Sequence, residues 1–228
     1  MLLQSGLLPE PAANAVVLDN ACGSGVLATI LFNTVGVDSG VKVVCGDLAE
    51  VMVETASKRI QENNWNAEAR IADAHQLPFP DDYFTHNLMN FGIQLVSNSE
   101  LALKECFRVL QPGGKVGFTA WVHPGWVDDL KVALEGVELP AFGKSPWRTK
   151  ESILNMLTPV GFTNVDVQPL VFEHRGKIST FVRYMGILFT KILVGENADK
   201  YSAYMTKKYG DGDFTSTWTA AIITADKP

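Results

Sequence analysis

Short apolar runs and amphipathic stretches alternate along most of this chain. The apolar runs have strand length and are rich in β-branched residues, as in residues 41–46. The stretches between them repeat apolar residues at helical spacing, as Met52, Ala56 and Ile60 do one turn apart. A regular succession of strand and helix is typical of a parallel sheet covered by helices. The pattern therefore predicts an α/β fold.

The predicted elements extend over nearly the whole chain, and no linker or repeat divides residues 1–228, so we expect a single domain. The predicted strands cover residues 16–19, 41–46, 69–72, 86–91, 115–121, a segment that begins at 165, and 217–225. The predicted helices cover 25–35, 48–63, a segment opened by the capping box Ser97-x-x-Glu100, 125–136, 149–157, 178–194 and 198–209.

Composition and charge narrow the classes of protein that fit. The chain has 228 residues, 46% of them hydrophobic and 19% charged, as in ordinary globular domains. The net charge of −6 argues against nucleic acid as a partner. Cys22, Cys45 and Cys106 form no C-x-x-C pattern, so we expect no metal site, no disulfide framework and a cytoplasmic location. The most apolar stretch, 181–194, is shorter than the roughly 20 residues of a membrane span.

The turn after the first strand carries the first chemical signal. Asp19 ends that strand, and Ala21, Gly23 and Gly25 precede the next helix. Glycines here let the backbone approach a ligand closely, and the helix offers free N–H groups, as in nucleotide-binding α/β folds. Residues 23–28 fit the dinucleotide pattern G-x-G-x-x-A. A carboxylate at Asp19 would instead repel a pyrophosphate and favour a cationic cofactor such as S-adenosylmethionine.

Two further acids follow the next two predicted strands. Asp47 lies at the distance from the turn where ribose-binding acids occur, and its carboxylate can accept both ribose hydroxyls. Its alternative role is to cap the following helix. Asp73 opens the block Asp-Ala-x-x-Leu-Pro-Phe-Pro-Asp-x-x-Phe at residues 73–84. Asp73 taken alone could equally belong to an ordinary turn. The whole block is a much more specific functional signal than a single aspartate.

These motifs together resemble those of class I S-adenosylmethionine-dependent methyltransferases. Asp19 and the glycine pair resemble motif I, with Ala21 in place of the first glycine of G-x-G-x-G. The block 73–84 and the run Arg-Val-Leu-Gln-Pro-Gly-Gly-Lys at 108–115 resemble later signatures of the family. A narrower likeness to fungal secondary-metabolite methyltransferases, including those that S-methylate dithiol diketopiperazines, is carried by residues 17–23, 45–48, 85–86, 91–94 and 103–108.

The resemblance implies a fold and a cofactor. The fold is a Rossmann-like α/β sheet of seven strands, mostly parallel with an antiparallel last strand, and with helices on both faces. The cofactor is S-adenosyl-L-methionine, with Asp73 accepting from the adenine amino group. The implied cofactor-binding residues are Asp19, Ala21, Gly23, Gly25, Asp47, Leu48, Met52, Asp73, Ala74 and Asn90.

The methyl acceptor is expected to be a small metabolite with a thiol, hydroxyl or amine. A thiol with a pKa of about 8.5 ionises readily, whereas an alcohol gains from a base. His123, after the fifth strand, is the candidate catalytic base, with a solvent-facing loop histidine as the alternative. Residues that could line an apolar acceptor pocket, or be ordinary core, are Phe91, Gln94, Trp121 and Trp126. We expect a helical substrate cap around 177–209, with core packing or a homodimer face as alternatives.

Two other functions stay open. An NAD-dependent oxidoreductase would explain the glycine turn and Asp47, but gives no reason for Asp73, and no catalytic Tyr-x-x-x-Lys is present. A non-catalytic S-adenosylmethionine-binding module is the second alternative, because few residues precede Val16. Related enzymes carry helices there that cover the cofactor. We therefore expect a shortened form that binds cofactor but turns over slowly.

Overall fold

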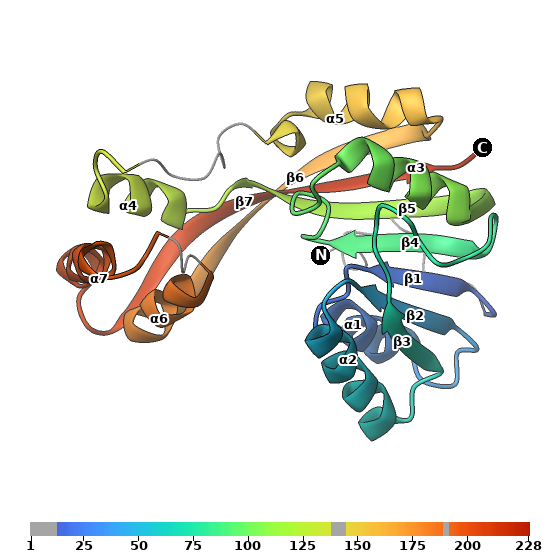
Figure 1. The fold of residues 1–228 in the computed structure, drawn as a ribbon, viewed down its shortest axis with the longest axis horizontal. Helices are drawn as coiled ribbons and strands as arrows, with labels where there is room; N and C mark the ends of the chain where they lie inside the picture. The colour runs from blue at the N-terminus through green and yellow to red at the C-terminus, as the bar shows by residue number, and fades with distance from the viewer. Residues whose placement is uncertain (1–12, 138–144, 189–191) are drawn as a thin grey trace. The chain divides into compact units, whose positions relative to one another are not determined.

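The computed structural model describes residues 13–137, 145–188 and 192–228 (Figure 1). The residues that come before the first strand, up to residue 12, lie outside this description. The strands are β1 (Val16–Asn20), β2 (Lys42–Asp47), β3 (Ala67–Ile71), β4 (Phe84–Asn90), β5 (Leu110–His123), β6 (Thr163–Lys177) and β7 (Asp213–Asp226). The α-helices are α1 (Val26–Val35), α2 (Glu50–Asn63), α3 (Ser99–Val109), α4 (Trp126–Ala133), α5 (Lys150–Leu157), α6 (Ile178–Leu188) and α7 (Glu196–Tyr209), with 3₁₀ turns at Pro146–Arg148 and Thr158–Val160.

The strands form one seven-stranded sheet in the order β3-β2-β1-β4-β5-β7-β6. β1 pairs in parallel with β2 and β4, β2 with β3, and β4 with β5. β7 runs antiparallel to β5: Lys227, the residue after β7, makes two backbone hydrogen bonds of 2.9 Å with Gly113 and Gly114 near the start of β5. The predicted fold class is confirmed. The parallel arrangement also brings the carboxyl ends of β1 to β4 to one edge of the sheet.

The chain divides into two compact units. The first contains the chain up to Trp121, Pro146–Gln168 and Ala221–Pro228. Its core is built from the central strands, whose apolar runs are buried on both faces as is typical of parallel sheets. Helix α2 packs against β2 and β3. Residues with no exposed surface in this core include Val17, Leu18, Val43, Val44, Phe84, Leu88 and Phe118.

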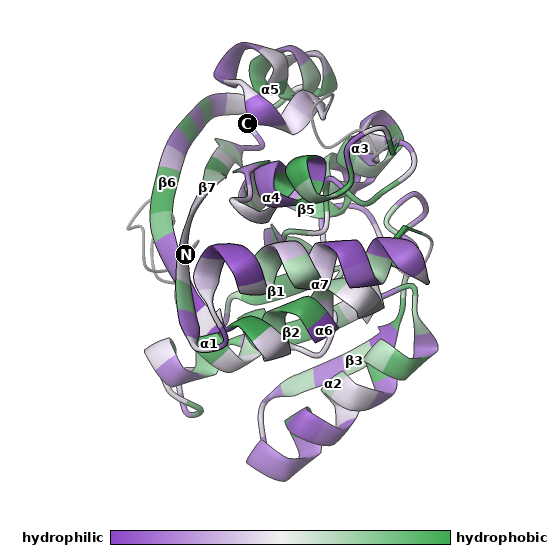
Figure 2. Cartoon of the chain, turned by 90° about the vertical axis from the view of Figure 1, so that its left-hand side faces the viewer, coloured by the Kyte–Doolittle hydropathy of each residue, from purple (hydrophilic) through white to green (hydrophobic). Residues whose placement is uncertain are grey.

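The second unit comprises Val122–Ser145 and Pro169–Ala220. Its core joins α4, α6, α7 and β7 through Trp126, Leu130, Phe181, Met185, Tyr201, Met205 and Phe214. Figure 2 shows mainly hydrophilic residues along the visible face of α7, consistent with an amphipathic helix. The carboxylate of Asp129 is buried, and accepts hydrogen bonds from the hydroxyls of Tyr204 (3.1 Å) and Tyr209 (2.8 Å) and from the ammonium of Lys208. This bonding satisfies the buried charge and ties α7 to α4.

Several predicted boundaries are corrected. The N-cap of α3 is Asn98 and not Ser97, because the Asn98 side chain accepts from the Leu101 N–H at 3.1 Å. β5 begins at Leu110, ahead of the Pro-Gly-Gly segment that was expected to precede it, and pairs there with Phe84 of β4. α6 is described to Leu188, and residues 189–191 lie outside the description. Residues 192–194 form a turn and bends, so the prediction of helix up to 194 is wrong there.

Two searches of the described residues were negative. None of their helices is long and apolar enough to cross a membrane. Within the same ranges, no group of three or more His, Cys, Asp or Glu side chains is arranged to hold a metal ion.

Candidate functional site

A cavity of about 590 Å³ opens in the first unit at the carboxyl ends of the parallel strands. Every lining residue belongs to β1, β2, β4 or to a segment that follows β1, β2, β3 or β4. The lining residues are Asn20, Ala21, Gly23, Asp47, Leu48, Ala49, Met52, Ala72, Asp73, Ala74, His75, Asn90, Phe91, Gly92, Leu95, Val96 and Ser97. All predicted cofactor-binding residues lie here except Asp19 and Gly25.

The turn between β1 and α1 is built on left-handed backbone. Ala21, Gly23 and Gly25 have φ angles of 56°, 53° and 76°. A Cβ added to Gly23 would meet no atom within 4 Å, so this glycine leaves its backbone open toward the cavity. A Cβ added to Gly25 would lie 3.5 Å from the Cβ of Ala56 in α2. Gly25 therefore serves the packing of α1 on α2, and does not line the cavity.

Asp47 fastens the glycine turn to the end of β2. Its Oδ2 accepts the Gly23 N–H at 2.8 Å, and its Oδ1 accepts the Ala49 N–H at 2.9 Å. Asp47 thus stabilises both the glycine turn and the backbone just before α2. Each carboxylate oxygen keeps a second lone pair that can accept a further hydrogen bond.

Asp19 is buried beneath the turn and outside the cavity lining, with 1% of its surface exposed. Its Oδ2 accepts the Ala28 N–H in α1 at 3.3 Å. Burial raises the pKa of this carboxyl to about 7, against the lowering effect of the Ala28 hydrogen bond. The neighbouring residue, Asn20, lines the cavity instead, because successive side chains of a strand point to opposite faces.

Asp73 is held by the loop that it opens. Its Oδ1 accepts both the backbone N–H of His75 at 2.9 Å and the ring Nδ1 of His75 at 2.7 Å. These two hydrogen bonds, the backbone one first, lower the pKa of Asp73. The carboxylate is therefore ionised at neutral pH and has a fixed orientation beside Ala74.

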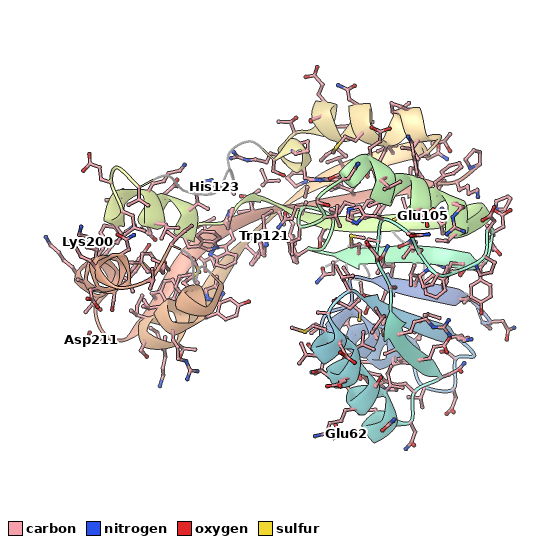
Figure 3. All side chains as sticks on the ribbon, in the orientation of Figure 1. Glu62, Glu105, Trp121, His123, Lys200 and Asp211 are labelled. Carbon is pink, nitrogen blue, oxygen red and sulfur yellow. The ribbon has the colours of Figure 1, made fainter. Side chains whose placement is uncertain are left out.

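Glu105 and Arg108 of α3 hold the segment that follows this loop. The carboxylate of Glu105, labelled in Figure 3, accepts the Leu77 N–H at 2.7 Å. The Arg108 guanidinium donates to Glu105, to Asp81 and to the carbonyls of Leu77 and Phe79, at 2.7 to 2.9 Å. The Leu-Pro-Phe-Pro-Asp motif and the Arg-x-Leu-x-Pro-Gly-Gly motif thus form one structural unit.

The aromatic wall of the cavity depends on an unusual backbone angle. Phe91 has a φ of 56°, and its N–H donates to the side-chain oxygen of Thr119 at 2.9 Å. Its ring stacks on Trp121 with 4.0 Å between centroids (Trp121 is labelled in Figure 3), and Trp121, which was expected to line the pocket, lies behind Phe91 and outside the lining. Gln94 was expected to offer a polar group to the acceptor. Its Oε1 instead accepts the Trp121 N–H at 2.6 Å, and Gln94 lies outside the lining.

Trp126 and His123 belong to the second unit. Trp126 is buried in its core, which is the alternative that the sequence left open. His123, near the end of β5 in Figure 3, has a 41% exposed side chain. Its Nε2 lies 2.9 Å from Asp128 Oδ2.

Sequence reasoning missed several residues of the cavity. His75 belongs to no motif in the sequence, although its position two residues after Asp73 is the spacing of an Asx turn. Asn20 was passed over because Asp19 carries the family motif. Leu95, Val96 and Ser97 lie in the loop between β4 and α3, where the sequence indicates a helix cap at Ser97 but no binding motif.

The sheet order, the glycine turn and the acids after β2 and β3 define a class I methyltransferase fold. Residues 17–114 match the methyltransferase domain family. The ubiquinone/menaquinone biosynthesis C-methyltransferase UbiE of Coxiella burnetii is 30% identical over 70% of this chain and 73% of its own length. The chain therefore belongs to the S-adenosylmethionine-dependent methyltransferases.

Other relatives match nearly the full length of the chain. Methyltransferase tpcH of Aspergillus fumigatus is 27% identical, over 100% of this chain and 90% of tpcH. The acetylaranotin bis-thiomethyltransferase of Aspergillus terreus is 28% identical, over 98% of this chain and 86% of that enzyme. These matches favour the methyltransferase hypothesis over the NAD-dependent one.

Solved structures share the fold at lower identity. The YcgJ protein of Bacillus subtilis superposes with a TM-score of 0.68 at 17% identity, covering 99% of this chain and 96% of YcgJ. Phosphoethanolamine N-methyltransferase 2 of Haemonchus contortus, solved with S-adenosyl-L-methionine, gives a TM-score of 0.63 at 18% identity over 100% of this chain and 51% of its own.

Proposed function

We propose that the cavity of the first unit binds S-adenosylmethionine and that the enzyme methylates a small-molecule thiol. The cavity volume of about 590 Å³ lies within the range of roughly 300–1,000 Å³ that is usual for small-ligand sites. Gly23 leaves its backbone open for close approach. The carbonyl oxygen of the Asn20 side chain is buried and has no hydrogen-bond partner in the described part of the chain, so a donor on the ligand would satisfy it.

In this proposal the predicted cofactor-binding residues have the following roles. Asp47 binds the ribose hydroxyls, and Asp73 with the backbone of Ala74 binds the adenine edge. Ala21 and Gly23 allow close approach of the amino-acid portion, Leu48 and Met52 supply apolar contact, and Asn90 lies toward the methyl group. Asp19 and Gly25 act indirectly, by supporting the turn.

The observation that carries the choice of acceptor is the state of the cavity's titratable groups. Among its described lining residues these are Asp47, Asp73 and His75, and each already has intramolecular hydrogen-bond partners. The remaining acceptor positions of Asp47 and Asp73 are the ones proposed to bind the ribose and the adenine, and Nε2 of His75 already accepts from Asn98, so none of the three is left to act as a base. A thiol, with a pKa of about 8.5, supplies enough thiolate at neutral pH to react without one, whereas an alcohol does not.

The protein's part in the reaction is positional. The bound cofactor supplies an electrophilic methyl group. The ring of Phe91, supported from behind by the stacked ring of Trp121, forms an apolar wall that excludes water and limits the directions from which a thiolate can approach. The positive φ of Phe91, held by Thr119, sets the orientation of that wall.

The relatives support an acceptor from secondary metabolism. The acetylaranotin bis-thiomethyltransferase acts, by its name, on sulfur. UbiE is a C-methyltransferase, so the family alone does not decide the acceptor atom. For a hydroxyl or amine acceptor, His123 with Asp128 stays the proposed base.

Other features stay predictions. They are the single domain with a substrate cap around 177–209, the homodimer, the cytoplasmic location, and the absence of a metal and of nucleic acid as a partner. Cys22, Cys45 and Cys106 are buried and unpaired, which supports a reducing compartment.

A methyl-transfer screen tests the proposal. Matched small dithiols, phenols and amines of similar size would be incubated with S-adenosylmethionine, and S-adenosylhomocysteine formation would be measured. We expect the thiols to be methylated fastest, with a rate that rises through the acceptor's own pKa. A higher kcat/KM for phenols or amines would overturn the thiol assignment. Failure to bind S-adenosylhomocysteine in calorimetry would overturn the cofactor site.

A further inference from the structure

His75 contacts two segments of the cavity wall that are distant in sequence. Its Nδ1 lies 2.7 Å from Oδ1 of Asp73, in the loop after β3. Its Nε2 lies 3.2 Å from the backbone nitrogen of Asn98 and 3.3 Å from Oγ of Ser97, in the loop between β4 and α3. Two other strands separate β3 from β4 in the sheet, so these loops have no backbone pairing to hold them together. The imidazole connects them.

The contacts determine which nitrogen of His75 carries the proton. A backbone N–H can only donate, so Nε2 must offer its lone pair to Asn98. The hydrogen of the neutral ring then resides on Nδ1 and is donated to the Asp73 carboxylate. This tautomer is fixed from both sides.

The same contacts fix the Asp73 carboxylate. The backbone N–H and the ring of His75 both donate to Oδ1, and neither uses Oδ2. The carboxylate therefore cannot rotate freely, and its second oxygen stays available to another donor. A donor such as an exocyclic amino group meets an acceptor whose direction is already set.

We propose that His75 is a positioning residue for adenine recognition: it orients Asp73 toward the adenine amino group and joins the loop after β3 to the start of α3. This inference rests on the proposed function, in which Asp73 faces the adenine. In this role His75 acts through Asp73 and has no contact with the methyl group.

Two isosteric substitutions separate the roles of the imidazole. His75→Asn can place an amide N–H where Nδ1 lies and keep the bond to Asp73, while losing the acceptor for Asn98. His75→Gln can place a carbonyl where Nε2 lies and keep the bond to Asn98, while losing the ring donor to Asp73. Gln76→Ala, at an exposed neighbouring residue, is the matched control.

The test is calorimetry of the full chain with S-adenosylhomocysteine and S-inosylhomocysteine, which lacks the amino group. We expect wild type, His75→Asn and Gln76→Ala to prefer the adenosyl ligand by about tenfold or more, the worth of one hydrogen bond to a charged group. His75→Gln should show a measurably smaller preference, because the backbone N–H of residue 75 alone then holds Asp73. Undiminished preference in His75→Gln would overturn the role of His75. Absence of a preference in wild type would instead overturn the placement of Asp73 and with it this inference.

Nitrogen-15 NMR of the imidazole in the wild-type protein is independent of any variant's folding. We expect a neutral ring protonated at Nδ1, which is the less common tautomer of free histidine. A ring protonated at Nε2 would overturn the proposal.

Discussion

Gly92 leaves the space that the methyl group of Ala21 fills. A Cβ built on Gly92 would come within 2.8 Å of the Ala21 Cβ and within 2.7 Å of the Met89 side chain. Ala21 stands where the family motif has glycine, and its φ of 56° is one that alanine adopts at a cost. The alanine at position 21 is thus accommodated because residue 92, in the loop after β4, is a glycine.

We expect the two positions to be coupled energetically. Gly92→Ala should lower the free energy of unfolding by about 1–3 kcal/mol through overpacking. Ala21→Gly should change it by less than about 1 kcal/mol, because relief of strain offsets the added chain entropy. The double variant should recover about 1 kcal/mol of the loss in urea denaturation. As a control, Ala21→Gly and Gly113→Ala should be additive, since a Cβ on Gly113 meets no atom within 4 Å. Additivity of the first pair would contradict the coupling.

Asp47→Ala should weaken cofactor binding more than any other single change in the cavity. The variant removes the ribose acceptor and also the bonds that hold Gly23 and Ala49. We expect the dissociation constant of S-adenosylhomocysteine to rise about 100-fold, the worth of two charge-assisted hydrogen bonds. Calorimetry would measure it, with Asp38→Ala at an exposed carboxylate as the control. A constant unchanged from wild type would remove Asp47 from the ribose site.

Arg108→Met should lower the free energy of unfolding more than is usual for a partly exposed surface cation. The guanidinium binds the carboxylate of Glu105 in α3, and it also binds the carboxylate of Asp81 and two backbone carbonyls in the loop before β4. Its loss therefore leaves the partly buried Glu105 without its cation. We expect a loss of about 2–3 kcal/mol in the free energy of unfolding. Arg175→Met, which breaks an exposed ion pair with Glu173, should lower the free energy of unfolding much less, because solvent screens that pair. Equal losses in the two variants would show that Arg108 is an ordinary surface cation.

Asp19 should make the protein less stable as the pH rises. Its folded-state pKa is raised to about 7 from 3.8, so the folded state holds the proton more tightly than the unfolded state. The stabilisation is fully present below pH 3.8 and is lost as the pH rises toward 7. Between pH 5 and pH 8 we expect wild type to lose about 2–3 kcal/mol relative to Asp19→Asn, which cannot ionise. Denaturation curves at both pH values measure this difference. Parallel changes in the two proteins would show that Asp19 does not titrate in this range.

The sheet was predictable because its signals are local. Each buried strand is a short apolar run, and each turn after it carries glycine or an acid. Parallel pairing then brings those acids together, which is why Asp47 and Asp73 share a cavity. The antiparallel last strand came from the family resemblance and not from periodicity.

Orientation and distant contacts were not predictable. Asp19 and Asn20 are adjacent, and the sequence does not show which of the two faces the cavity. Gln94 meets Trp121 across 27 residues, and no local pattern shows that its amide is used there. Trp126 fits a buried aromatic of a helix as well as a pocket wall, and only the packing around it decides.

The place of β7 between β5 and β6 has a consequence for biosynthesis. β7 follows every other strand in the chain, yet it fills the gap between two that precede it. A ribosome therefore releases β5 and β6 before the strand that pairs with both, and each keeps an unpaired edge until then. Such edges are sites of wrong association between nascent chains. The interval between synthesis of β6 and arrival of β7 is therefore the period in which these edges are open to such association.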